Sequence, residues 1–172
     1  MSMEGNLILC GFMGCGKSTV GRELSRLTGK KFLDLDSYVE QREGRTIPEI
    51  FDREGEPGFR AAEARAVQAL SQETGLIIAA GGGTLLFPGN AAAFRARGVI
   101  VLLDAPLAAI QERLRNDTSR PLIQKPNRNE VIRELYEKRL PAYREAADVT
   151  VDAGAPAREV ARRVLAALDP DC

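Results

Sequence analysis

The sequence has no histidine, few aromatic residues and no net charge. Of its 172 residues, 24 are Lys or Arg, 24 are Asp or Glu, and 5% are aromatic. Without histidine, Ser-His-Asp catalysis, Cys-His catalysis and imidazole metal sites are excluded, so acid–base chemistry falls to carboxylates, lysine, tyrosine or cysteine. A net charge of zero argues against a protein that binds nucleic acid or anionic membranes mainly through its charge.

Cysteines and long apolar runs are also scarce. Cys10, Cys15 and Cys172 are odd in number and widely separated, which favours a reducing compartment over a disulfide framework. The longest apolar runs are too short to cross a membrane, and no basic region precedes the apolar run near the N-terminus. We therefore expect a cytoplasmic monomer, one domain over residues 1–172, with neither nucleic acid nor membrane as a partner.

Short β-rich runs alternate with longer helical stretches along the whole chain. Strands are expected at Asn6–Cys10, Lys31–Asp34, Leu76–Ala79, 99–103 and 148–151. Helices are expected over Lys17–Thr28, 37–42, from Thr46 onward, 60–72, 106–116, 130–145 and 156–168. This alternation predicts an α/β fold, a central five-stranded parallel sheet with helices on both faces.

Residues 117–129 lack this periodicity and are rich in proline, asparagine and basic side chains. Between Arg113 and Arg128 there are five Lys or Arg and a single Asp, in a chain of zero net charge. Such a stretch is typical of a mobile loop that meets an anion.

Residues 11–18, Gly-Phe-Met-Gly-Cys-Gly-Lys-Ser, match the phosphate-binding pattern G-x-x-x-x-G-K-[ST]. The glycines let successive backbone N–H groups converge on phosphate oxygens, while Lys17 adds a charge and Ser18 a ligand for Mg²⁺. A strand precedes the loop, and the helix after it directs its positive end at the same anion. The motif predicts ATP or a similar nucleotide with Mg²⁺. Cys15 is expected to contribute only its backbone N–H.

The remainder of the chain favours a kinase among proteins with this loop. A switch GTPase would need N-K-x-D, which does not occur. A motor ATPase would need an apolar strand ending in Asp-Glu, but Ala105 follows Asp104. Both alternatives therefore lack a part that their chemistry requires.

Two further motifs suit phosphoryl transfer. Asp34-Leu35-Asp36 is expected to end the second strand, with Asp34 and Asp36 on one side of the sheet's carboxyl edge, one near Mg²⁺ and one near a substrate hydroxyl. The alternative is that these aspartates cap a helix. Gly81–Gly83 follow the third strand and predict bare backbone close to a small ligand, the alternative being a tight turn.

Taken together, these motifs resemble those of the shikimate kinase family. The shared segments, in the family's order and spacing, are GFMGCGKST (11–19), DLD (34–36), GEPGFRAAE (55–63), GGG (81–83), SRPL (119–122) and KRLPAY (138–143). The resemblance implies a three-layer P-loop kinase fold with a mobile lid. It also implies ATP-dependent phosphorylation of the 3-hydroxyl of shikimate, in the pathway to chorismate and the aromatic amino acids.

The resemblance also implies roles for individual residues. Those implied to hold ATP are Gly14, Cys15, Gly16, Lys17, Ser18, Thr19, Arg113, Arg120 and Pro156, with Arg113 and Pro156 beside the adenine. Those implied to bind shikimate are Asp36, Arg60, Gly81, Gly82, Gly83 and Arg139, the two arginines gripping its carboxylate.

The catalytic residues implied are Lys17, Asp36 and Arg120, with Asp36 as the candidate base and Arg120 as the lid arginine. Ser18 and Asp34 are implied to hold Mg²⁺. The acceptor region would span about 34–62 and the lid about 114–128. Two other functions stay open at this point: a gluconate- or nucleotide-type P-loop kinase, and a catalytically silent nucleotide-binding protein.

Overall fold

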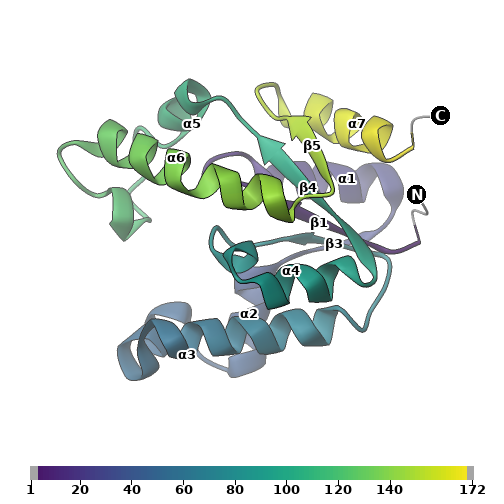
Figure 1. Ribbon diagram of the computed structural model, residues 1–172, viewed down its shortest axis with the longest axis horizontal. Coiled ribbons are helices and arrows are strands. Elements are labelled where there is room, and N and C mark those ends of the chain that lie inside the picture. Colours follow the sequence, from purple (N-terminus) through teal and green to yellow (C-terminus); the bar gives the residue numbers. More distant parts are fainter. Residues whose placement is uncertain (1–3, 170–172) are drawn as a thin grey trace.

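A computed structural model describes residues 4–169, and within them a sheet of five parallel strands forms the centre (Figure 1). The strands are β1 Asn6–Cys10, β2 Lys31–Asp34, β3 Leu76–Ala79, β4 Gly98–Asp104 and β5 Val149–Asp152. Their order across the sheet is β2-β3-β1-β4-β5, so the chain runs from the central strand β1 out to the edge strand β2, returns to β3, and then crosses β1 to reach β4 and β5. The predicted α/β fold is confirmed.

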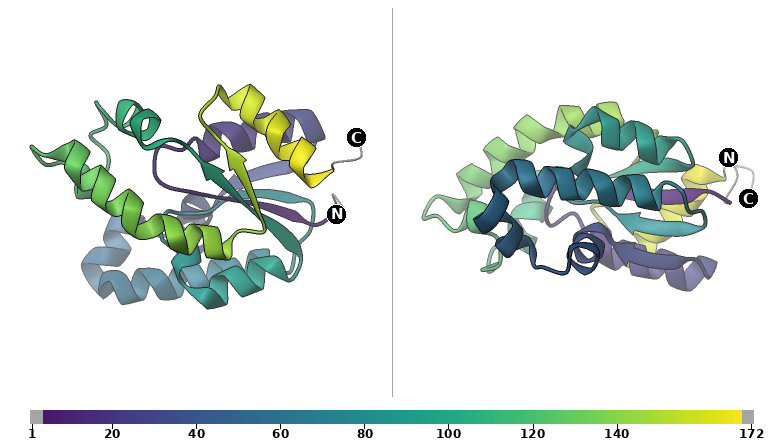
Figure 2. Two further views of the ribbon diagram at one scale, coloured as in Figure 1. Left: turned by 45° about the horizontal axis from the view of Figure 1, so that its top comes forward. Right: turned by 90° about the horizontal axis from the view of Figure 1, so that it is seen from below.

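Helices cover both faces of the sheet. The helices are α1 Lys17–Thr28, α2 Leu35–Glu43, α3 Ile47–Leu70, α4 Pro88–Arg95, α5 Leu107–Arg113, α6 Arg128–Ala146 and α7 Ala157–Leu168, with 3-10 turns η1 Thr84–Leu86 and η2 Pro121–Ile123. Figures 1 and 2 show α1 and α7 side by side on one face, and α3 with α4 on the other.

The central strands are buried because both of their faces are covered. All five residues of β1 are buried, and Ile8 and Leu9 are fully inaccessible to solvent. Strands covered on both sides need apolar side chains in every direction, which explains the apolar run from Leu7 to Cys10 in β1. The carboxyl ends of β1, β2 and β3 consequently meet on one rigid edge, where a ligand site is expected in such a sheet.

Three local features differ from the sequence prediction. The helices expected from Thr46 and over 60–72 are both present in α3, which non-helical backbone at Gly55 (φ 69°, ψ −170°) divides, but the second begins directly after Gly55 instead of at Arg60. The 3-10 turn η1 and helix α4 were not predicted, because 84–95 is a short stretch with little charge and no clear amphipathic period. The aperiodic stretch 117–129 contains the turn η2.

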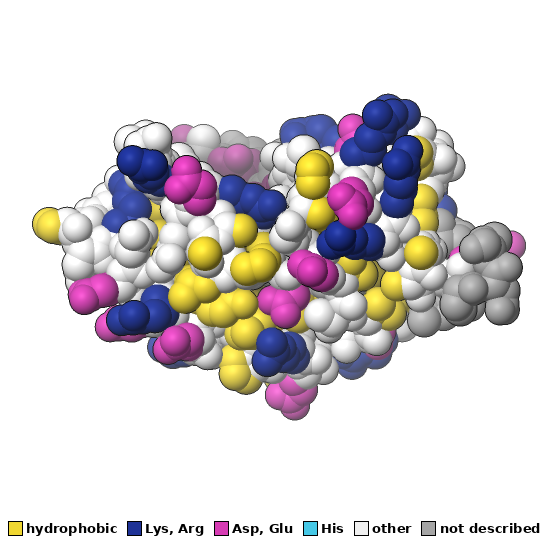
Figure 3. All heavy atoms as spheres, turned by 90° about the horizontal axis from the view of Figure 1, so that it is seen from above, with side chains coloured by type: hydrophobic (Ala, Val, Ile, Leu, Met, Phe, Trp, Pro, Cys, Tyr) yellow, Lys and Arg dark blue, Asp and Glu magenta, His cyan; other side chains and the backbone are white. Residues whose placement is uncertain are grey.

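The surface carries mixed charge. Seen from above, Lys and Arg side chains are interspersed with Asp and Glu, and hydrophobic side chains gather near the middle of that face (Figure 3). This distribution agrees with the net charge of zero. Within residues 4–169, no helix combines the length and the apolar character that a membrane span requires.

Candidate active site

The phosphate-binding motif forms a tight loop between β1 and α1. Gly14 (φ 79°) and Gly16 (φ 97°) adopt left-handed backbone conformations, and Gly16 lies directly before the first turn of α1. Residues with a side chain are strained in this conformation, so the path of the chain requires glycine at both positions. The Lys17 ammonium lies inside the loop, where Nζ donates to the carbonyls of Gly11 (2.6 Å) and Phe12 (3.3 Å).

Cys15 is buried beneath this loop. Its side chain is 2% exposed, and its backbone N–H donates to the Phe12 carbonyl at 3.1 Å, closing the turn. Its Sγ would lie 2.7 Å from a Cβ on Gly11, so the thiol packs tightly against the loop. The structure thus gives the side chain a packing role, and the binding of phosphate by its N–H stays a prediction.

The prediction that strand two ends in Asp34-Leu35-Asp36 is wrong. The strand ends at Asp34, and α2 begins at Leu35, because Asp34 Oδ1 accepts the N–H groups of Asp36 (3.0 Å) and Ser37 (3.3 Å) as a helix N-cap. The capping aspartate is therefore Asp34, and not Asp36, which precedes Ser37 and was the expected candidate for a cap. The other oxygen of Asp34, Oδ2, accepts the Ser18 hydroxyl at 3.2 Å.

Asp36 is a half-buried carboxylate on the first turn of α2. Burial, and then the negative charges of Asp34 and Glu63, raise the pKa of Asp36 from its ordinary 3.8 to about 6, against the opposing charge of Lys17. Perturbed carboxylates of this kind concentrate at functional sites, since an acceptor of protons near neutral pH suits acid–base chemistry.

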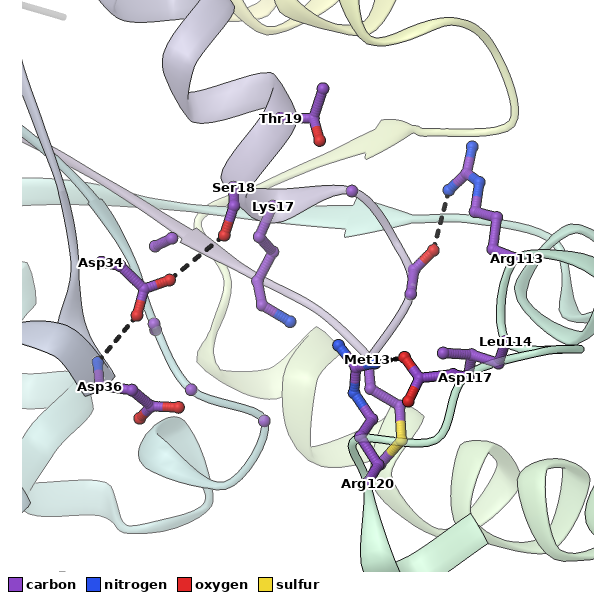
Figure 4. Close-up of a pocket in the computed structure, with 16 residues that line it drawn as sticks. Met13, Lys17, Ser18, Thr19, Asp34, Asp36, Arg113, Leu114, Asp117 and Arg120 are labelled. Carbon is purple, nitrogen blue, oxygen red and sulfur yellow. Dashed lines mark hydrogen bonds and ion pairs between the residues drawn. The ribbon is translucent and has the colours of Figure 1, made fainter. Parts of the chain in front are cut away.

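Two adjoining cavities meet at Asp36. The first, here called the P-loop cavity, has a volume of about 420 Å³. It is lined by the phosphate-binding loop and by Thr19, Asp34 and Arg113, among others. Figure 4 shows Lys17 from α1, Asp36 from α2 and Arg120 from the loop between α5 and α6 reaching into it. The second, the arginine cavity, has about 410 Å³ and is lined by Arg60 and Arg139 among others.

The residues common to both cavities are Met13, Asp36, Gly81, Gly82 and Arg120. Because the same side chains line both, a ligand in one cavity lies next to a ligand in the other at Asp36 and Arg120. This is the arrangement that a transfer reaction between two bound molecules requires.

Buried Glu63 organises one wall of the arginine cavity. Its carboxylate, in a residue only 1% exposed, accepts Arg60 Nη1 (2.9 Å) and the Thr84 hydroxyl (2.8 Å). Glu63 thus anchors one nitrogen of the Arg60 guanidinium, Nη1, in this wall. Arg60 lies one turn away on the same helix, α3, whereas Thr84 comes from η1, so the sequence gives no local signal for the contact between Glu63 and Thr84.

Each glycine of the triplet faces a different functional side chain. A Cβ on Gly81 would lie 3.2 Å from Asp36 Oδ1, and one on Gly82 would lie 3.3 Å from Arg139 Nη1. A Cβ on Gly83 would overlap the Arg60 guanidinium, whose Cζ would be 2.9 Å away. The triplet forms a turn, in which the Thr84 N–H donates to the Gly81 carbonyl at 3.3 Å, and a side chain at any of the three would crowd a neighbouring side chain. That this backbone approaches a small ligand stays a prediction.

Tyr143 contacts the glycine triplet from α6. Its hydroxyl donates to the Gly82 carbonyl at 2.5 Å. Burial raises the pKa of Tyr143 to about 12, although the charge and hydrogen bond of Arg139 act in the opposite direction. The phenol therefore stays a neutral donor, and α6 carries Arg139 and Tyr143 on adjacent turns toward the same glycine.

The basic stretch between α5 and α6 is internally hydrogen-bonded. Asp117 pairs with Arg120 and accepts both the N–H and the hydroxyl of Ser119 at 2.8 Å. Burial acts to raise the pKa of Asp117, but the Ser119 hydrogen bonds and the Arg120 charge outweigh it and lower that pKa. The Arg128 guanidinium donates to the carbonyls of Leu114 (2.7 Å) and Arg115 (3.0 Å).

Sequence reasoning missed Asp117 and Arg128, because an Asx turn inside an aperiodic stretch gives only a weak signal. The stretch is thus a defined loop that presents Arg120 to both cavities.

The two residues implied to flank adenine differ in position. Arg113 lines the P-loop cavity and donates to the carbonyls of Gly14 (3.0 Å) and Ala153 (3.3 Å). Pro156 directly precedes α7 and lines neither of the two cavities. The structure brings Arg113 to the phosphate loop and leaves Pro156 outside both cavities.

The site combines a phosphate-binding loop at the carboxyl edge of a parallel sheet with a carboxylate, a loop arginine and a second cavity beside it. This combination defines a kinase of the P-loop fold. The family model of shikimate kinase matches residues 13–169. The chain is also 47% identical to a shikimate kinase of Halorhodospira halophila over 163 residues, 94% of this chain and 92% of that one. This chain belongs to the shikimate kinase family.

Solved structures agree with this assignment. The shikimate kinase of Acinetobacter baumannii, in complex with shikimate, superposes with a TM-score of 0.87 at 38% identity, over 96% of this chain and 93% of that one. A gluconokinase of Sinorhizobium meliloti superposes over 99% of this chain and 94% of that one with a TM-score of 0.59 at 19% identity, and so shares the fold alone.

Proposed function

We propose that this chain transfers the γ-phosphoryl group of ATP to the 3-hydroxyl of shikimate, giving shikimate 3-phosphate and ADP. ATP occupies the P-loop cavity and shikimate the arginine cavity. The observation that carries the proposal is the wall shared by the two cavities, where Asp36 and Arg120 line both. Expectations of a cytoplasmic monomer that binds neither nucleic acid nor membrane stay predictions.

ATP binds through the P-loop. The backbone of residues 14–19 surrounds the phosphates, Lys17 neutralises charge on the β- and γ-phosphates, and Arg113 borders the nucleotide from α5. Stacking of Arg113 and Pro156 on the adenine is a prediction from the family, and Pro156 would need the nucleotide to extend beyond the P-loop cavity.

The site suits Mg²⁺ because the donors present are oxygens of the kind this ion prefers. Ser18 and Asp34 Oδ2 lie 3.2 Å apart beside Lys17, and they would hold the ion together with the phosphates of ATP. When bound, Mg²⁺ neutralises charge on the transferred phosphoryl group. Asp34 can serve this site and cap α2 at once, since Oδ1 makes the capping contacts.

Shikimate offers one carboxylate and three hydroxyls, and the arginine cavity has groups for both. Arg60 and Arg139 supply guanidinium forks for the carboxylate. Asp36 accepts a hydrogen bond from the reacting hydroxyl, while the bare backbone of Gly81–Gly83 lets the ring approach closely.

In the transfer step, the 3-hydroxyl oxygen forms a bond to the γ-phosphorus as the bond from that phosphorus to the bridging oxygen breaks. ADP leaves with the electron pair, and the hydroxyl proton passes to Asp36. Lys17 and Arg120 stabilise the charge on the phosphoryl group. In a loose transition state the proton leaves late, so Asp36 acts as much by orienting the hydroxyl as by basicity.

An ADP-release assay with Mg·ATP tests the proposal directly. We expect turnover with shikimate far above the rate without acceptor, and rates near that background with quinate, gluconate or AMP. Turnover with one of the other acceptors but not with shikimate would leave the P-loop chemistry intact and refute the proposed acceptor site. No transfer to any acceptor would support a silent nucleotide-binding protein instead.

Replacing Arg139 by alanine should raise the KM for shikimate by about 10- to 100-fold, the range expected from losing a charge-assisted hydrogen bond. The KM for ATP should change little, because Arg139 lines only the arginine cavity. Lys138→Ala is the matched control, since Lys138 is the adjacent cation on α6 and is exposed. An unchanged KM in Arg139→Ala would remove Arg139 from the carboxylate site.

Gly83→Ala should also weaken shikimate binding, by about tenfold or more, while the protein stays folded. Its Cβ would overlap the end of the flexible Arg60 side chain, which can move aside only by leaving its position in the cavity. Gly89→Ala is the control, because a Cβ on Gly89 in α4 would meet nothing within 4 Å. Wild-type affinity in Gly83→Ala, measured by calorimetry, would show that Arg60 need not occupy that position.

A further inference from the structure

The Arg60 guanidinium lies over two aromatic rings. Its Cζ is 5.2 Å from the ring centroid of Phe59 and 5.2 Å from that of Phe87. Phe59 is the neighbouring residue in sequence and is 7% exposed, so its presence is explained by the core. Phe87 comes from a different element and is 42% exposed, so core packing does not account for its ring.

The backbone fixes Phe87 in this position. Pro88 follows it and favours the extended conformation that it adopts (φ −101°, ψ 112°). Its carbonyl accepts the N–H groups of Asn90 (3.0 Å) and Ala91 (3.4 Å) in the first turn of α4. Phe87 is therefore held at the start of a helix rather than in a loose surface loop.

The same hydrogen-bond network ties Phe87 to Arg60. Glu63 accepts both Arg60 and Thr84, and the Thr84 carbonyl accepts the buried Asn90 side chain at 3.0 Å. Asn90 in turn bonds to the carbonyl of Phe87. A continuous chain of contacts thus sets the ring and the guanidinium relative to each other.

Arg60 needs such positioning because its hydrogen bonds alone leave it incompletely fixed. Nη1 bonds to Glu63, whereas Nε makes no hydrogen bond among the residues described and has only a 3.6 Å ion pair with Oε1 of Glu56, a side chain that is 66% exposed. A guanidinium side chain that becomes ordered only when the ligand binds loses conformational entropy, and this loss weakens binding of the ligand. An aromatic face within about 6 Å attracts the cation and restrains its plane before the ligand arrives.

We propose that Phe87 is a positioning residue for the acceptor site: its ring holds the Arg60 guanidinium in the orientation that receives the carboxylate of the acceptor. The inference rests on the proposed function, in which Arg60 binds that carboxylate. Phe87 lines neither of the two cavities, so it acts through Arg60. It therefore affects acceptor affinity and leaves the transfer step unchanged.

The test compares Phe87→Leu, which keeps an apolar side chain but removes the π face, with Phe87→Trp, which keeps that face. Phe51→Leu is the matched control, because Phe51 is also 42% exposed and stacks on Phe59 (5.1 Å) but not on Arg60. Calorimetric Kd and steady-state KM for shikimate are measured with kcat and the KM for ATP. Melting curves establish that each variant is folded.

We expect Phe87→Leu to raise the Kd and KM for shikimate about two- to fivefold, the range for a partly exposed cation–π contact, with kcat and the KM for ATP unchanged. Phe87→Trp and Phe51→Leu should stay within about 1.5-fold of wild type. In an Arg60→Ala background, Phe87→Leu should have no further effect, because the group it positions is gone.

Three results would overturn the inference: wild-type affinity in folded Phe87→Leu, an equal loss in Phe51→Leu, or a loss that persists in the Arg60→Ala background. Should Phe87→Leu not fold, Phe87→Met makes the same comparison. Phosphorylation of shikimate by the wild-type protein tests the proposed function separately. If wild type does not phosphorylate shikimate, the proposed function fails; if it does and Phe87→Leu binds normally, only the positioning role fails.

Discussion

Replacing Asp36 by asparagine should reduce kcat by about two to four orders of magnitude while the affinity for ATP stays close to that of the unmodified protein. The amide has nearly the same shape as the carboxylate, but it is a poor acceptor for the proton of the reacting hydroxyl. ATP affinity should persist because the phosphates contact the P-loop, which the substitution leaves intact. Loss of nucleotide binding in Asp36→Asn would refute the assignment.

The same substitution should stabilise the fold. Because folding raises the pKa of Asp36 from 3.8 to about 6, protonated Asp36 contributes stability that is fully present below about pH 4 and is lost as the pH rises through 6. At pH 7 the ionised carboxylate therefore costs about 1–3 kcal/mol, which neutral asparagine avoids. We expect Asp36→Asn to raise the melting temperature at pH 7 by roughly 3–8 °C.

The pH dependence separates this explanation from a general change in packing. The difference in stability between Asp36→Asn and wild type should shrink as the pH falls from 7 to 4, since wild-type Asp36 then becomes protonated. In wild type, kcat/KM should fall on the acid side with a pKa near 6. A stability difference that is independent of pH would contradict the raised pKa.

Asp34→Ala provides a contrast only two residues away. Asp34 caps α2 through the N–H groups of Asp36 and Ser37, so its loss should cost about 0.5–2 kcal/mol and lower the melting temperature. A lower melting temperature in Asp34→Ala and a higher one in Asp36→Asn would show that the Asp34 carboxylate stabilises the fold. They would also show that the Asp36 carboxylate destabilises the fold and is present for the reaction. A higher melting temperature in Asp34→Ala would contradict the capping role.

The phosphate loop could be predicted fully from the sequence because its structure depends on local rules. The backbone conformations of Gly14 and Gly16, the preceding apolar strand and the following helix are all set within a few residues of the motif. The error at Asp34-Leu35-Asp36 arose because two readings compete there. Strand alternation and helix capping both suit Asp34, and the side-chain bonds to the next two N–H groups decide for the helix.

Contacts between distant segments could not be predicted in this way. The pKa of Asp36 depends on Glu63, whose place beside it is set by the packing of α3 against α2 and α4. The fit of Arg60 against Gly83 and Phe87 likewise joins α3 to the segment around η1, and the two share no local pattern. The resemblance to the family assigns roles to individual residues. Only the three-dimensional arrangement shows which partner holds each of these side chains.

Replacing Arg120 by alanine should reduce kcat by about 10²- to 10⁴-fold in a protein that folds and still binds both substrates. Arg120 lines both cavities, so under the proposed function its guanidinium meets the phosphoryl group as it passes between them. Arg120→Lys should recover only part of the rate, because an ammonium keeps the charge but lacks the planar fork. Single-turnover kinetics separate this loss from slower product release.

Arg115→Ala is the matched control for the lid. Arg115 belongs to the same basic stretch, but its side chain is 72% exposed, pairs with Glu112 and lines neither cavity. Its carbonyl, which accepts Arg128, is kept in the alanine variant, so the loop stays defined. If Arg115→Ala slowed turnover as much as Arg120→Ala, the loop would act through its overall charge. Full activity in Arg120→Ala would rule out the lid role, whereas a loss confined to Arg120 would mean that one positioned guanidinium stabilises the transferred group.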